Sequence, residues 1–330
     1  ITHYTGNASN VTNGNPREIE TGVDISVDGG VMFFYILDDG GNSQHAFVTT
    51  DFSVGTYINQ EDASYFQTDA NGIQSYSLSG PRKGFTMGPS TIINKHNYNY
   101  AVVTIRKKEK FMATYLTQGY DPTPANPLNH PPIAAWAFRV DSNDGAIKPK
   151  YWQNNVGNGV GLSDQYVGLY WDDTDGIDTG SYGYGTAPFF DYSPGNTSST
   201  LQLGGVSGNN FGVQYLLVLL GPGYEFSHDG NTPAIKTIGW TGDGSYSGKH
   251  IFPYSPVRYM NHQWMFTKRC DNNTTGNNRW QMYFERMGLK ASTSGNQSFI
   301  CHAKNDQGST QGYFGSAYIG SYIRQASHYY

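Results

Sequence analysis

The sequence predicts an all-β protein, and three features of its composition favour that fold class. Glycine accounts for 41 of the 330 residues, whereas about 7% is usual. Charged residues make up 14% of the chain and aromatic residues 15%, although charged residues ordinarily reach about 25%. Helices are built mainly from Ala, Leu, Glu and Lys, while short strands joined by tight turns favour Tyr, Phe, Gly and Asn.

A short aromatic motif recurs along the chain and indicates an internal repeat. A Tyr-Thr-Gly turn begins at Tyr4, a Trp-Thr-Gly turn begins at Trp240, and Tyr115 occupies the equivalent place in a middle copy. Further landmarks follow in the same order. They are 31–39, 84–88 and 97–107 in the first copy, 133–145, 200–205 and 211–220 in the second, and 262–273 and 312–323 in the third. The copies begin roughly 110 to 125 residues apart, which is the size of one β-sandwich and too long for a solenoid repeat.

The repeat predicts three tandem β-sandwich domains, at 1–110, 111–228 and 229–330. The middle one carries Pro-rich and Asp-rich loop insertions. The third copy lacks a landmark for its closing strand, because Ser327–Tyr330 looks like only the start of such a strand. We therefore expect the polypeptide to continue beyond Tyr330.

Hydrophobic patterning separates one strand from the others. The run Tyr215–Leu220 is continuously apolar, which predicts a central strand buried on both faces. The other strands are expected to alternate, as half-buried strands do. The Pro-rich segment 121–132 cannot join a sheet interior and is expected to form a surface loop.

Charge, hydropathy and cysteine content narrow the function classes. The net charge of -5 argues against nucleic-acid binding, which requires a surplus of Lys and Arg. No apolar run reaches the roughly 18 residues of a membrane span, so membrane insertion is not expected. Cys270 and Cys301 allow two interpretations: a disulfide between neighbouring strands, or two buried free thiols.

The acidic loop 171–185 is the candidate binding site in the sequence. Its carboxylates offer oxygen ligands of the kind that Ca²⁺ takes, although their spacing departs from an EF-hand. Its aromatic rings beside carboxylate acceptors also suit contact with a glycan. A third interpretation is an Asp/Gly turn that satisfies its own backbone. The candidate residues are Trp171, Asp172, Asp173, Asp175, Asp178, Tyr182 and Tyr184.

Several motifs of the first copy resemble those of one family. They are the YTGN turn, the ETGVDIS segment, the GFTMG strand and the closing NYNYAVVTIRK strand, which together span nearly all of 1–110. In these the chain resembles bacteriophage surface proteins, those of marine phages especially, that carry tandem β-rich units. The resemblance implies lectin-like, jelly-roll-like sandwiches at the virion surface, other virion proteins as partners, and a homo-oligomer, with a trimer favoured.

The resemblance and the composition together predict a non-enzymatic, tail-fibre-like adhesin that contacts glycans of the host envelope. No cofactor is expected, apart from the Ca²⁺ interpretation of 171–185. One alternative is a capsid decoration protein. An alternative of another class is a polysaccharide depolymerase, which would need two carboxylates facing one cleft. The Glu residues are scattered and nothing in the sequence pairs two of them, but the many Asp residues could supply such a pair.

Overall fold

The described part of the chain consists of strands and connecting turns, without an α-helix. The computed structural model describes residues 1–8, 16–37, 45–59, 65–117, 123–140, 150–153, 167–170, 196–203, 214–224, 233–241, 263–269, 280–284, 299–302 and 317–324. The prediction of an all-β protein is confirmed for these residues.

Residues 2–106 form two sheets that pack on one another. The larger sheet has the strand order β1 (Thr2–Thr5), β9 (Asn99–Arg106), β3 (Gly30–Ile36), β4 (Ala46–Thr49), β5 (Thr56–Asn59) and β6 (Gln67–Thr68). The smaller sheet has the order β2 (Arg17–Glu20), β8 (Gly84–Met87) and β7 (Ile73–Ser75). One buried cluster contains side chains from both sheets, including Met32, Phe34 and Phe85. The arrangement is therefore sandwich-like.

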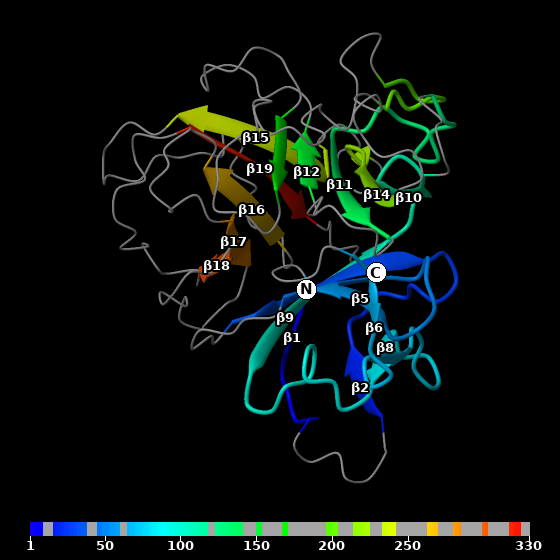
Figure 1. Cartoon of the computed structure of the whole chain (residues 1–330), viewed down its shortest axis with the longest axis vertical. Coiled ribbons are helices and arrows are strands. Elements are labelled where there is room, and N and C mark those ends of the chain that lie inside the picture. The colour runs from blue at the N-terminus through cyan, green and yellow to red at the C-terminus, as the bar shows by residue number, and fades with distance from the viewer. Residues whose placement is uncertain are drawn as a thin grey trace.

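Two further five-stranded sheets follow along the chain. The second sheet has the order β10 (Met112–Leu116), β14 (Tyr215–Leu220), β11 (Ala134–Arg139), β12 (Lys150–Gln153) and β13 (Val167–Tyr170). The third has the order β15 (Ile235–Thr241), β19 (Ala317–Arg324), β16 (Gln263–Arg269), β17 (Trp280–Phe284) and β18 (Phe299–His302). In Figure 1 the blue and cyan strands gather at the bottom, the green strands at the upper right, and the yellow to red strands at the upper left.

The same strand order recurs in the large sheet of each segment. In each large sheet the closing strand lies between the opening strand and the second strand, and the third strand follows the second. All of these pairs are antiparallel. Tyr4, Tyr115 and Trp240 lie on the three opening strands, opposite Tyr100, Leu217 and Tyr318 respectively. The third sheet departs from the pattern at its edge, where β17 and β18 are parallel. The limits 1–110, 111–228 and 229–330 stay a prediction as domain boundaries.

Strand β19 occupies the place that the sequence analysis expected to lie beyond Tyr330. It pairs with both β15 and β16, just as β9 pairs with β1 and β3. The Tyr, Gly and Ser residues of 312–323 interrupt the apolar run that marks the other two closing strands, so the sequence pattern does not identify this segment as a closing strand. The third sheet thus has a strand in the closing position.

Strands β3, β11 and β14 are buried on both faces. The prediction for Tyr215–Leu220 is confirmed, since every residue of β14 is buried. The expectation of half-buried strands is wrong for β3 and β11, whose residues are all buried as well. Each of these strands therefore has another layer of the molecule on either side.

The large sheet of the first segment and the second sheet pack on one another. One cluster of buried side chains extends from Val31 and Phe33 of β3 to Trp136 of β11 and Val218 of β14, and also includes Ile235. The rings of Phe33 and Trp136 lie 4.8 Å apart. Three independent sandwiches would each have a core of their own. Instead, the large sheet of the first segment shares a core with the second sheet, because both carry apolar side chains on the facing surfaces.

The Pro-rich segment covers the outer face of the second sheet. Leu128 and Leu201 are fully buried against Leu217 and Leu219 of β14. Backbone hydrogen bonds hold the segment in place, including one of 2.9 Å from the amide of Leu201 to the carbonyl of Pro124. The segment lies outside the sheet, as predicted, and contributes to the core beneath it.

The Tyr-Thr-Gly turn of the first copy has a structural role. The ring of Tyr4 stacks on that of Tyr100 with centroids 5.0 Å apart, and its hydroxyl donates to the carbonyl of Ile93. A Cβ on Gly6 would lie 1.9 Å from the carbonyl oxygen of Lys95, so only glycine permits this close approach. The motif therefore joins the first strand to the turn that precedes β9.

Candidate binding groove

The candidate site of the sequence analysis lies outside the described residues. This holds for Trp171, Asp172, Asp173, Asp175, Asp178, Tyr182 and Tyr184, and also for Cys270. Cys301 lies in β18, opposite Met282 of β17, and β17 lies between β18 and β16 in the sheet. The glycan, calcium and disulfide interpretations of these residues stay predictions.

A groove opens at one end of the first sandwich, with a volume of about 560 Å³. It lies where β3 begins and where β4, β7 and β9 end. Four short segments that are distant in sequence line it. The lining residues are Ile25, Ser26, Val27, Asp28, Gly29, Thr50, Phe52, Val54, Gln74, Ser75, Tyr76 and Lys107.

The floor of the groove is fixed by hydrogen bonds around Gly30. The amide of Gly30 donates to Thr50 Oγ1 at 2.9 Å, and the carbonyl of Gly29 accepts from the amide of Lys107 at 2.9 Å. Gly29 has a φ of 80°, and a Cβ there would lie 2.8 Å from Thr50 Oγ1 and 3.2 Å from Cδ of Lys107. Position 29 therefore requires glycine, both for its positive φ and for the lack of space for a Cβ.

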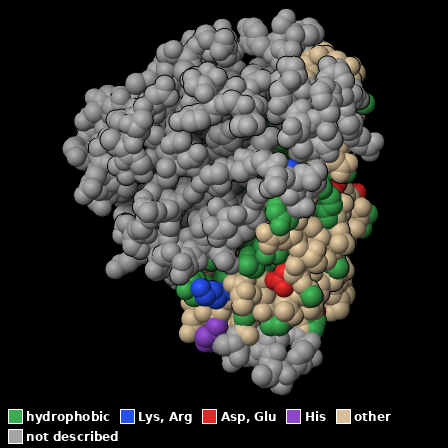
Figure 2. Space-filling model, in the orientation of Figure 1, with side chains coloured by type: hydrophobic (Ala, Val, Ile, Leu, Met, Phe, Trp, Pro, Cys, Tyr) green, Lys and Arg blue, Asp and Glu red, His purple; other side chains and the backbone are tan. Residues whose placement is uncertain are grey.

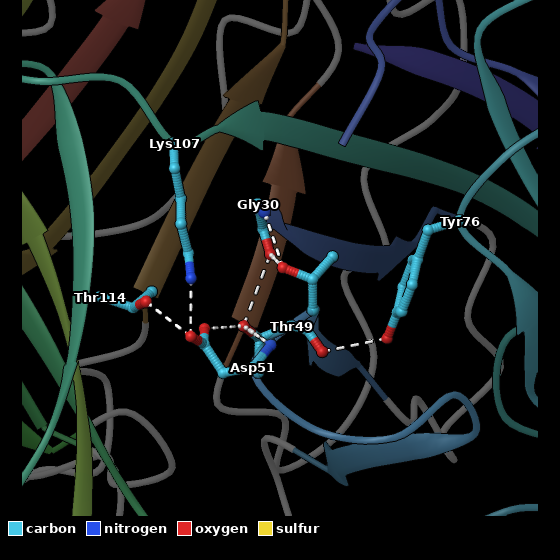
Figure 3. Close-up of polar contacts among 7 residues, drawn as sticks. Gly30, Thr49, Asp51, Tyr76, Lys107 and Thr114 are labelled. Atoms are coloured by element: carbon cyan, nitrogen blue, oxygen red, sulfur yellow. Dashed lines mark hydrogen bonds and ion pairs between the residues drawn. The ribbon is translucent and has the colours of Figure 1, made fainter. Parts of the chain in front are cut away.

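Asp51 holds Lys107 beside the groove (Figure 3). The carboxylate accepts from Lys107 Nζ at 2.6 Å and from Thr114 Oγ1 at 2.9 Å, both at Oδ1. Its other oxygen accepts from Thr49 Oγ1 at 2.5 Å. Because Thr114 belongs to β10, this network connects the first sandwich to the second sheet.

The segment 24–28 forms one wall. Asp24 Oδ1 accepts from both the amide and the hydroxyl of Ser26, at 2.8 and 2.6 Å, which fixes the turn and lowers the pKa of the Asp24 carboxyl. Val27 follows with 84% of its surface exposed. Asp28 lies next to it and pairs with Arg106 at 3.8 Å.

Tyr76 forms the opposite wall. Its hydroxyl donates to the carbonyl oxygen of Thr49 at 3.0 Å, which fixes the orientation of the ring (Figure 3). Burial, and then the nearby charge of Asp51, raises the pKa of Tyr76 well above its usual range. The hydroxyl therefore remains a hydrogen-bond donor at neutral pH.

The groove presents a mixed surface to solvent. Val27 and Val54, two of the three large hydrophobic side chains that are exposed among the described residues, both line it. Gln74 is exposed beside them, and Phe52 is half-buried. The exposed lining is more polar than apolar, so Val27 and Val54 add apolar contact to a largely polar groove.

Sequence reasoning missed the groove because its parts are far apart in the chain. Each segment contains only short turn residues. The pairing of β3 with β4 and β9 brings three of them together, and the fourth, 74–76, comes from the smaller sheet. No local signal marked the groove either, because 23–28 (VDISVD) alternates apolar and polar residues and so predicts an ordinary half-buried strand.

The described residues contain neither a metal-binding cluster nor a membrane-spanning helix. No group of three or more His, Cys, Asp or Glu side chains there is placed to hold a metal ion. The described stretches also include no helix that is long and apolar enough to span a bilayer.

Comparisons with known proteins add no assignment to this geometry. No protein-family profile matches the chain, and no curated protein or solved structure is significantly similar to it. The resemblance to phage surface proteins therefore rests on the sequence motifs.

Proposed function

We propose that the protein is a non-enzymatic component of a bacteriophage particle's surface, of the tail-fibre or adhesin type. In this proposal the groove of the first sandwich contacts glycans of the host envelope. The observation that carries it is the lining of the groove, in which exposed apolar side chains lie beside hydroxyl and amide groups.

The composition of this lining suits a sugar. A sugar ring has C–H faces that pack on apolar and aromatic side chains, and hydroxyls that exchange hydrogen bonds with polar groups. Val27 and Val54 offer exposed apolar contact, and the ring of Tyr76 is held rigidly by its hydrogen bond to Thr49. Rigid aromatic side chains contribute contact area with little loss of entropy.

The few charges of the surface also support a role in adhesion. Figure 2 shows that the described part of this face consists largely of hydrophobic and uncharged polar atoms, with few acidic or basic side chains. The particle-surface setting is supported by the motifs of the first copy. A homo-oligomer, with a trimer favoured, would cover exposed strand edges and would join other virion proteins.

A binding role fits the groove better than hydrolysis. Asp28 is the one carboxylate among the lining residues, and it is already paired with Arg106. Glycoside hydrolysis requires two carboxyl groups separated by about 5–10 Å. The lining thus supplies contact surface and one carboxylate, but not the pair of carboxyl groups that bond cleavage needs.

Binding of the purified chain to a glycan array and to host-envelope polysaccharide tests the proposal. We expect the wild type to bind, and Val27→Asp to weaken binding by about fivefold, because a rim contact contributes about 1 kcal/mol. Thr91→Asp places the same charge at an exposed position that does not line the groove and should bind like the wild type.

The outcomes separate the alternatives. Absence of binding to every glycan would contradict the proposal, and release of reducing ends from the polysaccharide would indicate a depolymerase. Immunogold labelling of particles distinguishes the tail from the head, where a capsid decoration protein would be found.

A further inference from the structure

The charged side chains that line the groove are both compensated. Lys107 and Asp28 are the charged residues of the lining. Lys107 Nζ lies 2.6 Å from Asp51 Oδ1, and Asp28 Oδ2 lies 3.8 Å from Arg106 Nη1. The lining therefore carries no surplus of either sign.

The compensation of Lys107 is built into the surrounding structure. Its stem passes over Gly29, where a Cβ would meet the Cδ and Cε atoms at 3.2 and 3.3 Å. Its ammonium group points at Asp51 rather than into open solvent (Figure 3). Three quarters of the Lys107 side chain is covered, since 25% of it is exposed.

Asp51 is itself held in place by neighbouring hydroxyls. Thr49 and Thr114 donate to its two oxygens at 2.5 and 2.9 Å. Hydrogen bonds to a charged acceptor are stronger than neutral ones. The carboxylate is therefore fixed opposite Lys107 before any ligand arrives.

This arrangement bears on the kind of glycan that fits. A uronate, phosphate or sulfate group binds best to a cationic donor that it does not have to share with a protein carboxylate. In the groove the nearest cation, Lys107, is already charge-compensated by Asp51, and an added anion would also approach the carboxylates of Asp28 and Asp51. Uncharged hydroxyls meet no such repulsion.

We infer that the groove selects uncharged glycans, and that Asp51 determines this selectivity by neutralising Lys107. The inference rests on the proposed function and names its substrate class. Asp51 does not line the groove, so it acts through the position and charge of Lys107.

Titration of the whole chain tests the inference, with dextran and galactan as neutral glycans and with alginate and polygalacturonate as uronate polymers. An array of neutral and uronate-bearing bacterial polysaccharides extends the test to more glycans. The wild type should prefer the neutral glycans. Asp51→Asn leaves Lys107 uncompensated and should raise affinity for the uronate polymers by about three- to fivefold. That gain should fade at high ionic strength, because salt screens exposed charges.

Two matched variants separate charge from shape. Thr114→Val removes a hydrogen bond to Asp51 but leaves the charge of Asp51 unchanged, so this variant should retain the preference for neutral glycans. Lys107→Gln leaves Asp51 unpaired and should lower uronate binding below the wild-type level, which tests the inference even where Asp51→Asn folds poorly.

The results distinguish failure of the inference from failure of the proposed function. A wild type that prefers uronate polymers overturns the selectivity and leaves glycan binding standing. Folded Asp51→Asn and Lys107→Gln proteins that bind uronates like the wild type overturn the role of Asp51. A chain that binds no glycan contradicts the proposed function, and the inference with it.

Discussion

The rings of Phe47 and Phe138 stack with their centroids 3.9 Å apart and their planes 8° from parallel. Phe47 lies in β4 of the first sandwich and Phe138 in β11 of the second sheet. Both are fully buried. The contact joins two segments that the sequence alone presents as separate modules.

Truncation of Phe47 should therefore destabilise the second sheet as well as the first sandwich. Phe47→Ala is expected to cost about 3–5 kcal/mol, the usual range for a buried Phe. All six Trp residues follow residue 110, and Trp136 packs on Phe33, so tryptophan fluorescence during urea unfolding reports the later sheets and the core that the second sheet shares with the first sandwich. We expect its midpoint to fall to lower urea in the variant.

Val27→Ala serves as the control, because Val27 is 84% exposed. Substitutions at exposed positions ordinarily change the free energy of unfolding by no more than about 0.5 kcal/mol. If the tryptophan transition of Phe47→Ala stays at the wild-type urea concentration while the tyrosine transition moves to lower urea, the two segments unfold independently.

Gly84 and Gly80 of the first copy should differ in how strongly they resist substitution, because only Gly84 lies against another strand. A Cβ on Gly84 would lie 2.0 Å from the carbonyl oxygen of Ile19, so β2 and β8 would have to separate. Gly84→Ala should cost more than about 2 kcal/mol. Gly80 has a φ of 71° with nothing within 4 Å, so Gly80→Ala should cost only about 1–2 kcal/mol from backbone strain. Thermal melting compares the two, and equal shifts would argue against the close strand approach.

Stability should fall in alkaline solution because buried tyrosines hold their protons in the folded state. Burial raises the pKa of Tyr4, Tyr76 and Tyr100 above the ordinary value near 10. The folded chain then binds more protons than the unfolded chain above that pH, so the free energy of unfolding decreases as pH rises. Below pH 10 this contribution is fully present.

Urea unfolding at pH 9, 10 and 11 measures this dependence, together with tyrosinate absorbance. Tyr76→Phe removes one of the titrating groups and should flatten the decline above pH 10, at the cost of about 1 kcal/mol for its hydrogen bond to Thr49. A decline of equal slope in the variant would exclude Tyr76 as a contributor.

The sequence predicted the parts of this fold that local pattern controls. Composition indicated the all-β class, and the unbroken apolar run at 215–220 indicated a strand with cover on both faces. The aromatic position of the opening strands, at Tyr4, Tyr115 and Trp240, also lies at equivalent places in the three sheets.

The remainder depends on contacts between distant residues. Nothing in the pattern of β3 or β11 says which layer covers its second face, so the contact between Phe47 and Phe138 could not be predicted. The closing strand β19 was misplaced because Gly320 and Ser321 interrupt its apolar character. The groove likewise exists only after 25–29, 50–54 and 74–76 have been brought together by the sheets.

Hydrogen–deuterium exchange of the whole chain, with and without a bound envelope glycan, tests the central claim most directly. The account predicts slower exchange on binding in 25–29, 50–54 and 74–76, the segments that line the groove. Protection confined to 171–185, or no protection in the three groove segments, would contradict it.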